Sequence, residues 1–150
     1  MNNVTHAGKR VTKVDGDTQW NEGVYMNAFI TQQPTFSVRI IQQQAPPIDI
    51  CVGVAVDSSR YTVQLNINGW CYYNYGRNYD HGSYTLTPLL PKVNDTVTVC
   101  VNLQSRTIEY KVQGNSTGPP RFMNISDSQF QLLRPIVELY YVGNSVEIYP

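Results

Sequence analysis

The sequence predicts an all-β fold in which short antiparallel strands pack as a sandwich or a barrel. Three observations support this class. Apolar residues recur at every second position in many short runs, turn-forming Gly, Pro, Asn and Asp residues separate the runs, and no segment shows a convincing apolar helical stripe. The chain has 150 residues, of which 41% are hydrophobic, so it is long enough for one domain with a substantial core.

Eight runs are expected to form strands because they alternate or are rich in β-branched and aromatic residues. In chain order they are 35–40, 48–56, 61–68, 70–75, 96–103, 107–113, 133–141 and 145–149. The runs 96–103 and 107–113 are separated by a short polar stretch, which predicts a hairpin with Leu103 on its inward face. Residues 124–134 are expected to hold a single turn or a short helix.

The run 48–56 has an unusual pair of faces. Ile and Val residues occupy one face, whereas the other carries the small residues Cys51, Gly53 and Ala55. This pattern predicts a strand that is buried on one side and closely approached on the other. Trp70 is expected to lie in the core.

Charge and cysteine usage limit the possible partners and the compartment. Lys plus Arg and Asp plus Glu number 11 each, so the net charge is zero and no basic excess favours nucleic acid or anionic membranes. No apolar run approaches the roughly 20 residues of a membrane helix, and the N-terminus lacks the apolar core of a secretory signal. Cys51, Cys71 and Cys100 are odd in number without CxxC spacing, which predicts reduced thiols. We therefore expect a cytoplasmic monomer.

Two groups of residues in the sequence have side chains of the types used in catalysis. The stretch 76–84, "GRNYDHGSY", carries His81 not far from Cys71, a combination that can supply a base and a nucleophile. Cys71 lies within a predicted strand, where neighbours point to opposite faces, so His81 is expected to stabilise its loop instead. Glu109 and Glu138 would need to face one cleft to act as a glycosidase pair, but each is expected on the outward face of a half-buried sheet. An enzyme is not predicted.

No cofactor or metal is predicted either. Residues 15–22, "DGDTQWNE", loosely resemble the start of a calcium loop but lack its glycine and its final acid. The three cysteines and two histidines share no zinc-ligand spacing. Glycine-rich phosphate-binding loops do not occur.

Six phrases, in a fixed order, carry a family likeness. They are "KRVTKVDG", "FSVRI", "IDICVGVAV", "NGWCYYNYG", "NDTVTVCVNLQSRTIEYKVQGNSTGPPRF" and "LLRPIVELYYVGNSVEIYP". Together they resemble the SPRY domain family over about residues 9–150, with residues 1–8 expected to be a flexible tail. The chain departs from the family pattern at Asn94 in place of glycine and at Asn102 in place of aspartate. Arg134 replaces a tyrosine and Arg121 a small residue.

The resemblance implies a bent sandwich of two antiparallel sheets that is not an enzyme. Such domains present loops at one end as a pre-formed pocket for a short peptide or a protein surface. They often serve as the recognition part of ubiquitin-ligase adaptors, tripartite-motif proteins or large scaffolds.

The pattern is closest to the SPRY domains that accompany a SOCS box. Carried over by position, their peptide pocket falls at Arg10, Pro46, Pro47, Tyr61 and Tyr141. Tyr79, in the stretch 76–84, is expected to border the same recognition surface. Two alternatives stay open: a lectin-like carbohydrate-binding sandwich, and a structural domain of a scaffold marked by an apolar patch on a sandwich face.

Overall fold

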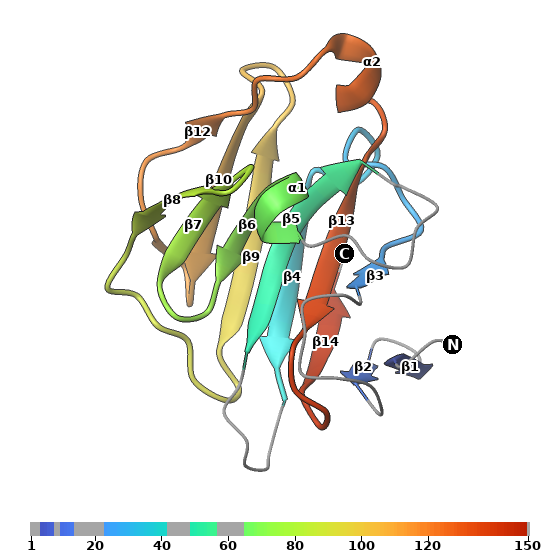
Figure 1. The fold of residues 1–150 in the computed structure, drawn as a ribbon, viewed down its shortest axis with the longest axis vertical. Helices are drawn as coiled ribbons and strands as arrows, with labels where there is room; N and C mark the ends of the chain where they lie inside the picture. Colours follow the sequence, from blue (N-terminus) through green and yellow to red (C-terminus); the bar gives the residue numbers. More distant parts are fainter. Residues whose placement is uncertain (1–3, 8–9, 14–22, 42–48, 57–64, 150) are drawn as a thin grey trace.

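The protein is a sandwich of two antiparallel β-sheets, as a computed structural model shows (Figure 1). The structure describes residues 4–7, 10–13, 23–41, 49–56 and 65–149. Within these residues the helices are two single turns, α1 (Leu65–Asn68) and α2 (Asp127–Phe130). The predicted all-β fold class, a sandwich of two antiparallel sheets, is confirmed.

The larger sheet has eight strands in the order β1-β2-β14-β4-β9-β10-β11, with β12 also paired to β10. Its strands are β1 (Val4–Ala7), β2 (Arg10–Lys13), β4 (Thr35–Ile40), β9 (Thr96–Asn102), β10 (Thr107–Val112), β11 (Asn115–Ser116), β12 (Arg121–Phe122) and β14 (Ser145–Tyr149). The structure pairs β1 with β2, although β1 falls in the segment 1–8 expected to be a tail. The domain boundary at residue 9 stays a prediction.

The smaller sheet has six strands in the order β3-β13-β5-β6-β7-β8. Its strands are β3 (Gly23–Tyr25), β5 (Ile50–Val56), β6 (Gly69–Tyr73), β7 (Arg77–Asp80), β8 (Ser83–Leu86) and β13 (Leu133–Leu139). Every neighbouring pair in both sheets is antiparallel.

The core lies between the sheets and follows the period-two pattern of the sequence. In β4, β9 and β10, buried apolar residues alternate with more exposed polar ones. Trp70 is only 2% exposed and belongs to the core, as predicted. Tyr72 of β6 meets Tyr110 of β10 across the core, with ring centroids 6.2 Å apart.

Strand β5 is covered on both faces, as its small residues predicted. Ile50, Val52 and Val54 face the inter-sheet core, whereas Cys51 and Ala55 belong to a second buried cluster on the outer side. At Gly53 the neighbouring β6 comes so close that an added Cβ would lie 1.9 Å from the carbonyl oxygen of Trp70. Only glycine fits at this position.

Part of the run 61–68 was wrongly expected to be a strand. Leu65–Asn68 forms α1 instead, while 61–64 lie outside the described residues. Leu65 is fully buried against the outer face of the smaller sheet, so tertiary packing decides the local structure here. Leu103 also differs from expectation, because β9 ends before it and its side chain is 38% exposed. Helix α2 falls within 124–134, as predicted.

Glu138 corrects another expectation. It lies on the outward side of β13, but its side chain is fully buried and meets the first residue of α1. The backbone N–H of Leu65 donates a hydrogen bond to its carboxyl group. Burial raises the pKa of Glu138 to about 8, although this hydrogen bond and the charge of Lys13 act in the opposite direction.

The close approach at Gly53 gives a direct test of the packing. We expect Gly53→Ala to lower the free energy of unfolding by about 3 kcal/mol or more, because the new methyl group would meet backbone atoms that cannot rotate away. Gly118→Ala is the matched control, since an added Cβ there would lie 3.5 Å from its nearest neighbour. Urea denaturation of both variants measures the difference, and equal stabilities would contradict the close packing.

The buried carboxyl of Glu138 predicts a pH dependence. Between pH about 4.5 and about 8 the unfolded state releases the proton and the folded state keeps it, so stability falls as pH rises through this window. Glu138→Gln cannot titrate and serves as the reference. Relative to it, the free energy of unfolding of the wild type should fall by on the order of a few kcal/mol between pH about 4.5 and about 8. Urea denaturation at several pH values measures this difference. A difference that does not change with pH would show that Glu138 is not protonated in the fold.

Candidate functional site

The candidate site lies at one end of the sandwich, where the turn between β13 and β14 and the turn between β6 and β7 lie on either side of the start of β5, in the lower half of Figure 1. The first turn contacts Asp49, just before β5, and the second contacts Ile50, its first residue. Two asparagine side chains make the connection. The side-chain oxygen of Asn144 accepts the N–H of Asp49 at 3.0 Å, and that of Asn74 accepts the N–H of Ile50 at 3.0 Å. Both amides are buried.

Backbone hydrogen bonds reinforce this arrangement. The Tyr140 N–H donates to the carbonyl of Asp49 at 3.0 Å, and the Asn74 N–H donates to the carbonyl of Ile50 at 3.2 Å. Because buried polar groups that lose a partner are destabilising, these bonds hold both turns to β5.

Strand β2 joins the same end. The carbonyl oxygen of Lys13 accepts the N–H of Gly143 at 2.7 Å, where a φ of +93° favours glycine. The buried ammonium of Lys13 donates to the carbonyl of Tyr140 at 2.8 Å. The turn that carries Tyr141 is therefore fixed from two sides.

Four tyrosines and one carboxylate form what we call the end cluster, defined as Asp49, Tyr73, Tyr75, Tyr140 and Tyr141. Tyr73 and Tyr75 make an edge-to-face pair with centroids 5.2 Å apart, and Tyr140 and Tyr141 make another at 4.7 Å. The hydroxyl of Tyr73 donates to Asp49 at 3.3 Å. Tyr75 is 50% exposed and Tyr141 is partly exposed, so the cluster presents aromatic surface to solvent.

The electrostatics of the end cluster centre on Asp49. Burial raises the pKa of Asp49, while hydrogen bonds from Tyr73 and Tyr75 act to lower it. Burial, followed by the charge of Asp49, raises the pKa of Tyr73. The pKa of Tyr75 is raised by the same causes, with a smaller contribution from Tyr141. These hydroxyls therefore stay protonated and act as hydrogen-bond donors.

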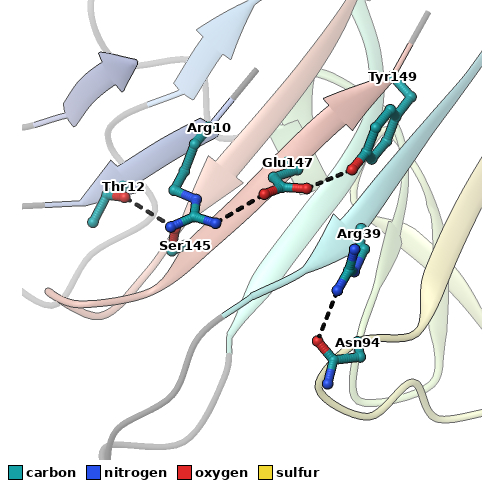
Figure 2. A network of polar contacts seen from close by, with 7 residues as sticks. All are labelled: Arg10, Thr12, Arg39, Asn94, Ser145, Glu147 and Tyr149. Atoms are coloured by element: carbon teal, nitrogen blue, oxygen red, sulfur yellow. Dashed lines mark hydrogen bonds and ion pairs between the residues drawn. The ribbon is translucent and has the colours of Figure 1, made fainter. Parts of the chain in front are cut away.

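Arg10 lies elsewhere, on the outer face of the larger sheet (Figure 2). Its guanidinium pairs with Glu147 at 2.8 Å, and the hydroxyl of Tyr149 also donates to that carboxylate. The Arg10 side chain is 52% exposed, so the pair is open to solvent. Nearby, Arg39 donates to the side chain of Asn94 at 3.3 Å.

Tyr79 is 8% exposed and packs in the buried cluster on the outer side of the smaller sheet. Its hydroxyl accepts a hydrogen bond from Arg77 at 3.0 Å. Among the described residues, no hydrogen bond, ion pair or ring contact joins Arg10, Tyr79 and Tyr141 to one another. Pro46, Pro47 and Tyr61 lie outside the described residues, so the predicted pocket stays a prediction.

The sequence analysis missed Asp49, Tyr73 and Tyr75. One signal was available in the sequence: Tyr73 and Tyr75 are two residues apart at the end of a predicted strand, a spacing that places side chains on one face. The position of Tyr141 near this pair depends on the contacts of Asn74 and Asn144 with residues 49 and 50, and no local sequence pattern predicts these contacts.

His81 stabilises its loop. Its ring packs edge-on against Trp70 with centroids 4.3 Å apart, and its Nδ1 lies 3.1 Å from the Asp80 carboxylate. Cys71 is fully buried in the outer cluster of the smaller sheet, which also contains Tyr79. Cys71 and His81, the possible nucleophile and base, therefore pack against different residues.

The two carboxylates weighed for glycosidase chemistry lie on different sheets. Glu109, on the outer face of β10, lies 3.8 Å from Lys111 and accepts a hydrogen bond from Ser116 at 3.2 Å. Glu138 is fully buried and accepts the N–H of Leu65. A hollow of about 290 Å³ lies beside Glu109 and is lined by Cys100, Val101, Asn102, Thr107, Glu109 and Pro120.

The outer face of the larger sheet is polar where it is described. Ser37 bonds with Thr98 and Thr12 with Ser145, each at 2.9 Å. In the described parts of the chain, no three His, Cys, Asp or Glu side chains are grouped to hold a metal ion. No helix in those parts has the length and apolarity needed to cross a membrane.

Comparison with known proteins agrees with this geometry. The family model of the SPRY domain matches residues 34–149. The crystal structure of a human SPRY domain is similar, with a TM-score of 0.78 at 14% identity, covering 98% of this chain and 94% of that one. The SPRY domain of human HERC1 has a TM-score of 0.64 at 22% identity, covering 96% and 89%. A comparison with curated protein sequences found no match.

The chain is thus an antiparallel β-sandwich with a candidate site formed by the turns at one end. It belongs to the SPRY domain family. Members of this family are commonly protein-interaction modules and are generally non-catalytic.

Asn144 offers a test of how the end cluster is held. Asn144→Ala should lower the free energy of unfolding by about 1–3 kcal/mol, because the buried N–H of Asp49 loses its partner. Asn124→Ala, at an exposed loop position, is the control and should change stability little. Thermal and urea denaturation measure both, and equal effects would contradict the role given to Asn144.

Proposed function

We propose that this domain binds a short peptide or a protein surface through the end cluster. The observation that carries the proposal is that partly exposed tyrosines gather at one end, on turns fixed by buried asparagines. Val142, 41% exposed in the same turn as Tyr141, extends the apolar surface. Tyrosine is favoured at binding surfaces because it offers a large ring and a hydroxyl at little entropic cost.

Pre-organisation supports the proposal further. Loops that are already ordered lose less conformational entropy when a ligand binds, so more of the contact energy appears as affinity. The Tyr75 ring would pack against an apolar side chain of the ligand. The hydroxyls of Tyr73 and Tyr75, whose protons are directed at Asp49, would accept hydrogen bonds from its backbone N–H groups.

Of the residues carried over from SPRY domains that accompany a SOCS box, Pro46, Pro47 and Tyr141 belong to this proposal, whereas Arg10 lies away from the end cluster and would join only a ligand that reaches it. Pro46 and Pro47 closely precede Asp49 in the sequence, and Tyr141 is a member of the end cluster. Arg10 would have to exchange Glu147 for a ligand carboxylate. Such binding would suit the recognition part of a larger adaptor, ubiquitin-ligase or scaffold protein.

The lectin-like alternative is less well supported by this geometry. A sugar site needs carboxylate or amide groups that face the ligand beside an aromatic ring. At this end Asp49 accepts tyrosine hydroxyls, and the side-chain oxygens of Asn74 and Asn144 accept buried backbone N–H groups.

Substitution of the exposed tyrosines tests the proposal. A peptide obtained by unbiased display on this domain should bind Tyr75→Ala and Tyr141→Ala more weakly by about 2 kcal/mol or more, with folding unchanged. Phe122→Ala, which removes a ring that is 58% exposed on β12, should leave the affinity unchanged. Isothermal titration calorimetry measures the dissociation constant of the peptide for each of the three variants. Full affinity in both tyrosine variants would refute the end cluster as the binding site.

A further inference from the structure

Strand β8 forms an open edge of the smaller sheet. It is the last strand in the sheet order, and among the described strands it pairs only with β7 (Figure 1). All four of its residues are exposed, with Tyr84 at 48% and Leu86 at 75%. Natural proteins commonly protect such edges with lysine, proline or a bulge, because an open edge invites another strand to pair. The sequence of β8, Ser-Tyr-Thr-Leu, contains neither lysine nor proline.

The register shows which backbone groups face the open side. A two-residue turn joins Asp80 to Ser83, and the Thr87 N–H donates to the Gly76 carbonyl at 2.9 Å. Hydrogen-bonded pairs alternate in an antiparallel ladder, so the N–H and C=O groups of Tyr84 and Leu86 point away from β7. Within the described chain, no hydrogen bond from another segment reaches these groups.

The outward face of this edge carries a cation held in place by two tyrosines. The guanidinium of Arg77 lies 4.5 Å from the ring centroid of Tyr84 and donates to the Tyr79 hydroxyl at 3.0 Å. Tyr79 packs against Tyr84 with centroids 5.4 Å apart. No carboxylate in the described residues pairs with Arg77. An arginine held in this way is suited to bind a carboxylate with its remaining N–H groups.

An apolar surface adjoins the cation. Leu86 lies opposite Arg77 in the ladder, and Leu90, which is 54% exposed, reaches within 3.1 Å of the Cβ position at Gly76. Within the described part of the chain, one edge therefore combines free backbone groups, a cation without a carboxylate partner and the exposed Leu86.

We propose that β8 binds an extended peptide of a partner protein as an added antiparallel strand, at a site distinct from the end cluster. Antiparallel pairing continues the pattern of the whole sheet. Read from its N-terminus, the peptide would place an apolar residue opposite Leu86 and, two positions later, an acidic residue opposite Tyr84. The acid would then meet the guanidinium of Arg77.

A second copy of this chain fits the edge poorly. Paired edges would each present Arg77, and β8 itself carries no acidic residue to neutralise it. Charge complementarity therefore favours an acidic partner.

The test uses synthetic heptapeptides of the form acetyl-Thr-Thr-apolar-Thr-acidic-Thr-Thr-amide, with Leu, Ile, Val, Phe or Tyr at position 3 and Glu or Asp at position 5. We expect at least one to bind the domain with Kd below about 1 mM, and its Gln or Asn counterpart to bind roughly tenfold more weakly. The Arg77→Gln variant should bind the acidic peptide only as tightly as the wild type binds the neutral counterpart. Tyr75→Ala and Tyr141→Ala should not affect it, which separates this site from the proposed function.

Backbone pairing is tested separately. Methylation of the peptide nitrogen at position 3 or 5 should abolish binding, whereas methylation at position 4 should be tolerated, because only residues 3 and 5 exchange hydrogen bonds with β8. NMR should show slower amide exchange at Tyr84 and Leu86 in the complex. The proposal is overturned if no acidic peptide binds more tightly than its neutral counterpart, or if methylation at positions 3, 4 and 5 changes the affinity equally. It is also overturned if sedimentation shows that the domain dimerises and the dimer pairs through β8.

Discussion

The burial of β5 on both faces is the constraint on which the rest of the structure depends. Its large residues fill the space between the sheets, and its small residues allow β6 and α1 to pack closely on the other side. Gly53 sets the distance to β6, because any side chain there would overlap backbone atoms. The first residues of β5 then anchor the two turns that carry the exposed tyrosines. A strand packed in this way cannot shift without breaking both the core and the end cluster.

Two surfaces with different recognition chemistry follow from this frame. The end cluster offers side chains on turns whose backbones are already bonded, so its specificity would come from ring packing and tyrosine hydroxyls. The edge of β8 offers backbone groups, with Arg77 and Leu86 selecting the side chains of an added strand. A SPRY domain with both surfaces could hold one long ligand or two separate ones, and neither surface requires chemistry on the ligand.

Much of the fold could be predicted because local alternation reports directly on burial in a two-sheet sandwich. The small residues of 48–56 predicted its close packing, and the resemblance to SPRY domains identified the family. Asn94, noted in place of a family glycine, has a φ of +74°, a conformation that asparagine tolerates better than most residues. The formation of α1 and the burial of Glu138 could not be predicted, because both depend on packing between segments that are distant in sequence. The end cluster likewise depends on contacts of Asn74 and Asn144 with a strand distant in sequence.

The most direct test of the central claim is a structure of the domain with a display-selected peptide, using Arg77→Gln as bait so that β8 does not dominate the selection. The account predicts a peptide in contact with Tyr75 and Tyr141, with β5 and both turns unmoved from their positions in the free domain. A peptide bound on the polar outer face of the larger sheet would contradict it, as would turns that rearrange around the ligand.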